Sequence, residues 1–218
     1  MSEIENGHGL QARRAAITDL GDALRLLIEQ ATATEAPTAD LLRAAALIRQ
    51  AAAPLGERAR GRFETASADD LLGGVRLYNP VTGGGSAFAP PLEIHRDGDV
   101  AVGSCTLGRA FEGPPSFAHG GVSAMLLDQM LGYACGMSGH PGMTVQLDTG
   151  YRQPVPLYTP LRLTARVAAV DKRVITATGT IATAEDPASI LVRATGKFVA
   201  LLPEQAQRLF GPVMGRGR

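Results

Sequence analysis

Residues 119–135 read HGGVSAMLLDQMLGYAC, and this segment limits the folds that the chain can adopt. From Val122 to Cys135 it is nearly all apolar, which over this length is typical of a helix buried on most sides. Asp128 is the only charged residue between Gly120 and Met137. Burying a carboxylate without a partner is costly, so such a residue is normally paired, neutralised or functional. The segment therefore predicts a central helix with a carboxylate whose role must be explained.

Strand-like runs lie on both sides of this helix. They are Val100–Leu107 before it and Thr144–Arg152, Leu161–Val170, Val174–Thr183 and Ile190–Leu201 after it. Within Leu161–Val170 apolar and polar residues alternate, so we expect one face of that strand to be buried and the other exposed. This order predicts an α+β fold in which an antiparallel meander wraps one long helix.

The chain divides near residue 60 into a helical part and the part that holds the strands. Before that point apolar residues recur at helical spacing in two runs, Ile17, Leu20, Leu24 and Leu27, then Leu41, Ala45, Ile48 and Ala52. They predict a helical hairpin over residues 1–60 whose apolar stripe must pack on something. Residues 61–98 are rich in Gly and Pro and predict a long connection with short strands at most. We therefore expect an extension over 1–60, a domain over 61–202 and a C-terminal tail over 203–218.

Composition and charge exclude several classes of function. Lys+Arg and Asp+Glu are 21 each, so no net charge recruits nucleic acid or an anionic membrane. The first residues have neither the basic nor the apolar region of a secretory signal, and no apolar run is long enough to span a membrane. Two cysteines make no disulfide framework, and the four histidines lack metal-ligand spacing. We expect a soluble cytoplasmic protein that needs no metal or redox cofactor.

Two glycines open the central helix. The amides of Gly120 and Gly121 lie among the unpaired donors of the first turn, where the helix dipole helps them to stabilise a developing oxyanion. Glycine also lets a reacting carbonyl approach closely. The alternatives are that the glycines serve only for tight packing, and that Asp128 pairs with an arginine such as Arg152 or Arg109.

The spacing between the helix start and the carboxylate bears on the oligomeric state. Gly120 and Asp128 are eight residues apart, which is about 12 Å along a helix. Both groups would have to lie about 3 Å from one reacting carbon, which a single helix cannot arrange. Two helices related by a two-fold axis can place Gly120 of one subunit opposite Asp128 of the other. If these residues form one site, the protein is at least a dimer with two shared sites.

The segment from Phe111 to Asp128, FEGPPSFAHGGVSAMLLD, resembles the PaaI-like and THEM4-like hotdog-fold thioesterases. The hallmark of that family is His-Gly-Gly with an acid nine residues after the His. Residues 143–144 and 151–154 are similar to the strand that follows in those proteins. Upstream, residues 79–83 and 89–92 are similar to a segment of actinobacterial members. The resemblance covers roughly residues 76–201 and implies a hotdog fold, to which the N-terminal helices are an extension.

The resemblance also implies roles for individual residues. The catalytic acid of the family falls on Asp128, which would activate water or attack the thioester directly. The oxyanion amide falls on Gly120, with Gly121 adjacent. The water-orienting hydroxyl falls on Thr144, although an ordinary strand residue is the alternative there. By strand parity, Thr144 should share a face with Gln146.

Four further residues complete the candidate site. His119 matches a family position, but a His just before a helix can instead cap the helix or fix the loop. Tyr151 belongs to the strand motif, and Arg152 is a candidate for binding the phosphates of coenzyme A, with Arg173 and Lys197 as secondary candidates. The alternative for each of these cations is a solvated surface charge.

Together these residues imply an acyl-CoA thioesterase of lipid metabolism that acts as a homodimer or a dimer of dimers. Two departures from the family keep an alternative open, because Gly113 stands where some relatives carry Asn and Gln153 stands where they carry a second basic residue. That alternative is a non-catalytic acyl-CoA-binding or assembly protein with the same fold. A hotdog dehydratase is a third interpretation, but it would need a His and an acid to converge on the substrate, and His119 precedes its helix.

Overall fold

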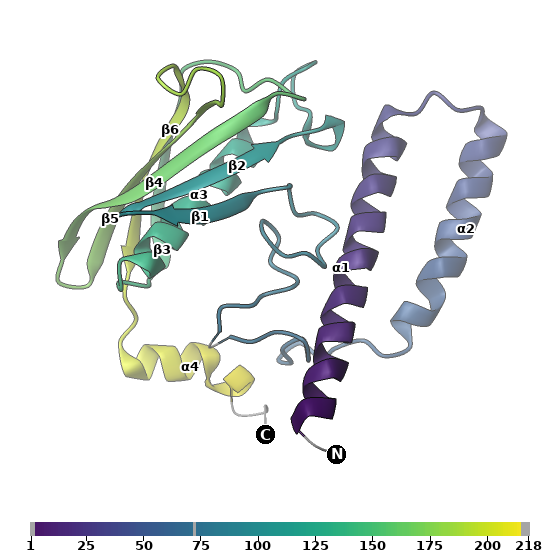
Figure 1. Cartoon of the computed structure of the whole chain (residues 1–218), viewed down its shortest axis with the longest axis horizontal. Helices are drawn as coiled ribbons and strands as arrows, with labels where there is room; N and C mark the ends of the chain where they lie inside the picture. Colours follow the sequence, from purple (N-terminus) through teal and green to yellow (C-terminus); the bar gives the residue numbers. More distant parts are fainter. Residues whose placement is uncertain (1–2, 72, 215–218) are drawn as a thin grey trace.

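A computed structural model of the chain describes residues 3–71 and 73–214. Figure 1 shows a six-stranded antiparallel sheet, a helix packed against it, and two long helices beyond one edge of the sheet. In chain order the elements are α1 (Glu3–Ala33), α2 (Thr38–Gly56), β1 (Glu93–Asp97), β2 (Val100–Thr106), the 3-10 helix η1 (Arg109–Phe111), α3 (Gly120–Met137), β3 (Met143–Tyr151), β4 (Pro160–Asp171), β5 (Val174–Thr183), β6 (Ile190–Val199) and α4 (Pro203–Met214). The helix and the five strands predicted after residue 98 are present within two residues of their expected bounds.

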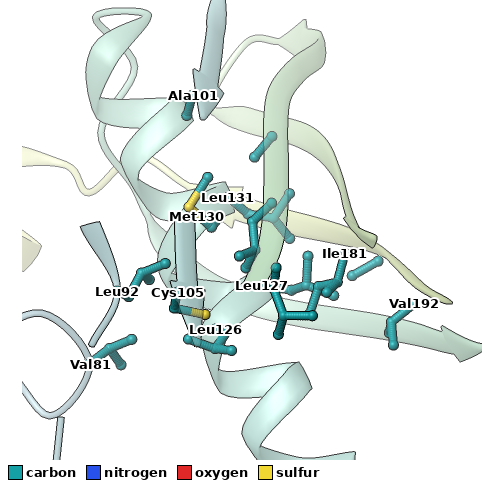
Figure 2. Packing of buried hydrophobic residues seen from close by; sticks show 14 of the residues in the cluster. Val81, Leu92, Ala101, Cys105, Leu126, Leu127, Met130, Leu131, Ile181 and Val192 are labelled. Atoms are coloured by element: carbon teal, nitrogen blue, oxygen red, sulfur yellow. The ribbon is translucent and has the colours of Figure 1, made fainter. Parts of the chain in front are cut away.

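Helix α3 forms the centre of the hydrophobic core. Its side chains at Leu126, Leu127, Met130 and Leu131 are fully buried against the inner face of the sheet (Figure 2). Burying each such side chain contributes roughly 1.5–3 kcal/mol, which explains why so apolar a helix lies inside rather than on the surface. Because the core fixes α3 against the sheet, it also fixes the position of Asp128 relative to the strands.

The strand order corrects the expected meander. Strands β4, β5 and β6 do form consecutive hairpins, but the full order is β1-β2-β4-β5-β6-β3. Strand β3 therefore does not neighbour β4, which follows it in sequence; it pairs with β6 at the far edge. Alternation along a strand reveals which face is buried but not which strand lies beside it, so periodicity could not predict this order.

The segment before the sheet is a long connection, as predicted, and among its described residues only 93–97 form a strand. The glycine run at residues 83–85 lies against α1 rather than at a ligand site. A Cβ on Gly21 of α1 would lie 2.1 Å from the Gly84 carbonyl oxygen, so a glycine in α1 is needed for this close approach. Arg25 fixes the contact by donating from Nη1 to the carbonyls of Gly84 and Ser86, at 2.9 and 2.6 Å.

The predicted hairpin is present, but its apolar stripe is buried only in part. Helix α1 packs on the connection, whereas α2 contains no buried residue. In the predicted stripe of α2, Leu41 is 46% exposed and Ile48 is 43% exposed. The expectation that the stripe packs on something is therefore correct for α1 and wrong for α2 within a single chain, because α2 stands on the outer side of α1 (Figure 1).

Within the predicted C-terminal tail, residues 203–214 form α4. The bounds of the three expected parts remain a prediction. None of the helices in residues 3–71 and 73–214 combines the length and the apolar character that crossing a membrane requires.

Candidate active site

The carboxylate of Asp128 lies half-buried in the middle of α3 and has a side-chain partner on the sheet. Thr144 on β3 donates a hydrogen bond from Oγ1 to Asp128 Oδ1 at 3.0 Å. The arginine pairing that the sequence left open is not present in the described residues. Nη1 of Arg109 instead lies 3.8 Å from Oε2 of Glu112, and Arg152 lines a cavity at the N-terminal end of α3.

A bulge in β3 is what turns Thr144 toward the helix. Thr144 pairs with Phe198, which is buried on the inner face, whereas Gln146 pairs with the exposed Lys197. The additional residue between them, Val145, shifts the register. The prediction that Thr144 and Gln146 share a face is therefore wrong, because a bulge breaks the two-residue period of a strand.

The N-terminus of α3 is capped by His119. Its Nδ1 accepts a hydrogen bond from the Gly121 N–H at 3.0 Å, which is the capping role left open for this histidine. Because the Gly121 amide already donates to His119, it is not available as a second oxyanion donor. In the part of the chain that the structure describes, the Gly120 N–H meets no acceptor, as expected in the first turn of a helix.

Tyr151 joins the end of β3 to this helix start. Its hydroxyl donates to the Gly120 carbonyl oxygen at 2.9 Å. Tyr151 and Gly120, with Arg152 and Ser123, line a cavity of about 340 Å³. Sequence analysis named Tyr151 only for its resemblance to the strand motif; no local pattern predicted that its hydroxyl would reach the helix.

The two secondary basic candidates lie elsewhere. Arg173 donates from Nη1 to the Ala200 carbonyl and to Gln205 Oε1, both at 3.3 Å, so it joins the turn between β4 and β5 to the start of α4. Lys197 is exposed on the sheet face opposite α3, as its pairing with Gln146 shows. Neither residue lines the cavity beside Gly120.

Asn79 is a residue whose place near the site the sequence did not predict. Its Oδ1 accepts from the amides of Val81 and Thr82, at 2.8 and 3.1 Å, and forms the turn that an Asn-Pro pair favours. Its Nδ2 donates to Oε1 of Gln129, the neighbour of Asp128, at 3.4 Å. The turn thereby lies beside the middle of α3.

The departure at Gly113 has a structural reason. A Cβ at this position would lie 2.7 Å from His119 Cα. The loop between η1 and α3 folds back on itself here, with the Gly113 N–H donating to the Phe117 carbonyl at 2.9 Å. An asparagine at residue 113 would displace the residue that caps α3, so this chain cannot use a side chain there.

The two cysteines pack in the core and are unsuited to nucleophilic chemistry. Burial raises the pKa of Cys105 to about 12 and that of Cys135 to about 11. Both thiols therefore stay protonated near neutral pH. Within the described ranges, no group of three or more His, Cys, Asp or Glu side chains is arranged to hold a metal ion.

Proteins of similar sequence and structure place the chain in a family. Residues 116–189 match the family model described as Thioesterase superfamily. The crystal structure of a thioesterase superfamily protein is 37% identical to this chain, with a TM-score of 0.75, and the match covers 84% of this chain and 90% of that one. The chain belongs to the thioesterase superfamily, and its six-stranded sheet around α3 is the hotdog fold that the His-Gly-Gly motif led us to expect.

Curated relatives are similar over a shorter region. Acyl-coenzyme A thioesterase THEM4 of Mus musculus is 30% identical over 98 residues, which are 45% of this chain and 42% of that protein. The protein of the same name from Xenopus laevis is 31% identical over 100 residues, 44% of this chain and 43% of that protein. This chain therefore spans less than half the length of the curated relatives it matches.

Proposed function

We propose that this chain is an acyl-CoA thioesterase, which converts an acyl-CoA and water into a carboxylic acid and coenzyme A. The observation that carries the proposal is the contact of Thr144 with Asp128, on the same helix whose first residue, Gly120, lines a cavity. The names of the curated relatives support the choice of acyl-CoA as the substrate class.

The hydrogen bond between Thr144 and Asp128 suits the activation of water. Thr144 donates its only hydroxyl proton to Asp128 Oδ1, so its oxygen lone pairs remain to accept a hydrogen bond from a water molecule. A water that donates one proton to Thr144 and the other to Asp128 directs its oxygen lone pair at the substrate. Asp128 then accepts a proton as the C–O bond forms. Direct attack by the carboxylate is the alternative, and it gives an anhydride that water cleaves in a second step.

The first turn of α3 suits the other half of the reaction. As the carbonyl carbon becomes tetrahedral, its oxygen gains negative charge, which the Gly120 N–H and the positive end of the helix dipole stabilise. Collapse of this intermediate breaks the C–S bond. The thiolate of coenzyme A leaves and takes up the proton that the attacking water gave to Asp128. Arg152 lines the cavity beside Gly120, where its charge favours the phosphates of coenzyme A.

The two halves belong to different subunits in this proposal. Helix α3 is continuous, so Gly120 and Asp128 of one chain are about 12 Å apart along its axis. Strand β3 is an edge strand whose Val145 is 61% exposed. An unpaired edge of this kind can pair with the same strand of a second copy, which would bring two α3 helices together about a two-fold axis. We therefore propose a homodimer with two shared sites; a dimer of dimers remains compatible with this arrangement.

The decisive experiment measures thiol release from short-chain, long-chain and aromatic acyl-CoAs. The Asp128→Asn variant removes the carboxylate charge at nearly constant volume, so we expect the fold to persist and the turnover number to fall by about 10²–10⁴-fold. Asp148→Asn is a matched control, because Asp148 lies on the opposite face of the same sheet and, among the described residues, its side chain accepts only from Gln146 Nε2. Equal turnover by wild type and Asp128→Asn would refute the assignment of the acid.

The alternative functions predict other products. A non-catalytic acyl-CoA-binding protein would bind coenzyme A or acyl-CoA in calorimetry but release no thiol from any substrate. A dehydratase would change the unsaturation of the acyl chain and leave the thioester intact. A cytoplasmic location and a role in lipid metabolism remain predictions.

A further inference from the structure

A carboxylate from the N-terminal extension reaches the segment that precedes the active-site loop. Glu29, near the end of α1, accepts three hydrogen bonds. Its Oε1 accepts from the Arg109 N–H at 2.9 Å and from the Tyr158 hydroxyl at 2.8 Å, and its Oε2 accepts from the Ala110 N–H at 3.0 Å. Gly108 makes room for it, since a Cβ there would lie 2.5 Å from Oε2.

The two amides belong to the first turn of η1. Amides at the start of a helical turn have no partner within it, so an acceptor from outside holds the turn in place. Here that acceptor comes from a residue 80 positions earlier in the chain. Helix α1 is itself held to the body, because Arg14 Nε donates to the Ala68 carbonyl at 2.9 Å and Arg25 binds two further carbonyls.

From η1 a short path leads to the proposed oxyanion site. The carbonyl of Phe111, the last residue of η1, accepts the His119 N–H at 2.9 Å. His119 caps α3 and directly precedes Gly120. The angle at which the Gly120 N–H meets a substrate therefore depends on where η1 lies.

Tyr158 links the same carboxylate to the other side of this loop. Residues 155–157, just before Tyr158, bind this loop through two backbone hydrogen bonds. The Val155 carbonyl accepts from the Ala118 N–H at 2.8 Å, and the Leu157 N–H donates to the Ser116 carbonyl at 3.0 Å. Tyr158 has a φ of 54°, an unfavourable value for a tyrosine, and its hydroxyl bond to Glu29 helps to hold that conformation. The Glu29 side chain thus restrains η1, which precedes residues 112–118 in the chain, and the segment ending at Tyr158, which is hydrogen-bonded to them.

We propose that Glu29 is a positioning residue of the active site, through which the N-terminal extension fixes the loop that presents the Gly120 amide. The proposal deepens the proposed function and rests on it for its kinetic consequences. Glu29 does not contact the substrate in this role; it acts through η1 and His119.

The ionisation of Glu29 agrees with this geometry. Partial burial alone would raise its pKa, but the amides of Ala110 and Arg109, the Tyr158 hydroxyl and the Arg109 charge outweigh burial and lower the pKa below its ordinary value of 4.5. The side chain is therefore an anion near neutral pH, with acceptors for all three donors.

The first test needs no catalytic activity. Hydrogen–deuterium exchange is measured on the full-length wild type, on Glu29→Ala and Glu29→Gln, and on the control Glu35→Gln, whose side chain is exposed just beyond α1. We expect Glu29→Ala to accelerate exchange in peptides covering residues 107–121, with β4 and β5 unchanged. Glu29→Gln, which keeps one acceptor oxygen, should lie between Glu29→Ala and wild type. Unchanged exchange in residues 107–121 would overturn the proposal.

The second test separates positioning from simple loss of stability. In thiol release, we expect Glu29→Ala to lower kcat about tenfold or more, because a misplaced donor stabilises the transition state less, while KM changes by less than about threefold. Tyr158→Phe should produce a smaller loss, and adding it to Glu29→Ala should cause little further change, since both remove the same contact. A kcat per folded molecule equal to wild type, with only the melting temperature lowered, would overturn the proposal.

The two hypotheses can fail separately. If the wild type releases no thiol from any substrate, the proposed function fails, while exchange in residues 107–121 still decides whether Glu29 restrains the loop. If the wild type is active and the Glu29 variants match it in both exchange and kcat, the positioning role fails and the thioesterase stands.

Discussion

At the residue scale, the proposed chemistry depends on two contacts, at the start and the middle of α3. The hydroxyl of Thr144 orients Asp128, and His119 takes the Gly121 amide so that the Gly120 amide is left to face a substrate. Each contact limits which hydrogen bonds the adjacent groups can still form. A hydroxyl that donates to a carboxylate must accept from water, and a first turn with one capped amide has a single glycine N–H beside the cavity.

The Gly120 amide can be removed without removing the helix. Proline is favoured at the first helical position, and His119, with φ −61° and ψ 136°, already has the conformation that a following proline requires. We expect Gly120→Pro to fold and to lower kcat by about 10²–10³-fold, the usual cost of losing one oxyanion donor. The measurements are thiol release and circular dichroism.

Gly120→Ala is the matched control for this change. It keeps the N–H, and its Cβ would lie 3.4 Å from the Tyr151 ring, which is ordinary contact. It should therefore retain far more activity than Gly120→Pro. If alanine and proline reduce kcat equally, steric blocking rather than loss of the amide explains the effect, and Gly120 is not the oxyanion donor.

At the element scale, an irregularity in the edge strand β3 fits it to the regular helix α3. The bulge at Val145 brings Thr144 to the inner face, and regular pairing beyond it brings Tyr151 to the same face at the helix start. Strand β3 thereby touches α3 at both points on which the proposed chemistry depends. Helix α1 adds a third support through η1.

The docking of α1 should depend on pH through Glu29. Its pKa is lowered in the folded protein, so the ionised form is favoured by folding; the stabilisation is present above the unfolded value, near 4.5, and is lost as pH falls through the folded value. We expect the difference in free energy of unfolding between wild type and Glu29→Gln to be largest near pH 7 and to shrink below about pH 4.5. Arg109, Tyr158 and Arg25 are the charged or titratable groups around this carboxylate.

Urea unfolding at several pH values measures this difference. Glu35→Gln should differ little from wild type at every pH. A Glu29→Gln effect that grows on acidification would contradict the expected sign, and an effect independent of pH would show that the charge of Glu29 does not contribute.

At the scale of the whole molecule, the single chain leaves apolar surface and a strand edge exposed. Strand β3 has no neighbour on its outer side among the described residues, and α2 buries none of its side chains. The distance between Gly120 and Asp128 gives an independent reason for a second copy. The proposed site is complete only when two chains meet.

Mixing two inactive variants tests the shared site. Asp128→Asn and Gly120→Pro are each expected to be nearly inactive, but a heterodimer of the two contains one site built from two native residues. Random reassortment should therefore restore about one quarter of wild-type activity, because half of the dimers are mixed and each has one intact site. The measurement is thiol release after the variants are unfolded and refolded together.

Mixing each variant with itself is the control. Activity that stays at the sum of the separate variants, in protein shown by sedimentation to be dimeric, would mean that each site lies within one chain. A monomer in sedimentation would remove the dimer from the proposal altogether.

Local patterns in the sequence were enough to predict the fold class and to nominate the residues of the candidate site. An apolar helix with one carboxylate can only be internal, and alternation along the following runs assigns their buried faces, so α3 and strands β2 to β6 were predicted closely. The family motif named Asp128, Gly120 and Thr144. These are local signals, since each depends on residues within one or two turns or strands.

How these parts meet became visible only in three dimensions. The strand order, the bulge that reverses Thr144, the engagement of Gly121 by His119 and the reach of Glu29 to η1 all join residues through space or through a local break in periodicity. Periodicity states which face of an element is buried, but not what covers it. For the same reason the sequence could not foresee that α2 lies outside the core, or that an N-terminal carboxylate lies one hydrogen-bonded loop away from the candidate active site.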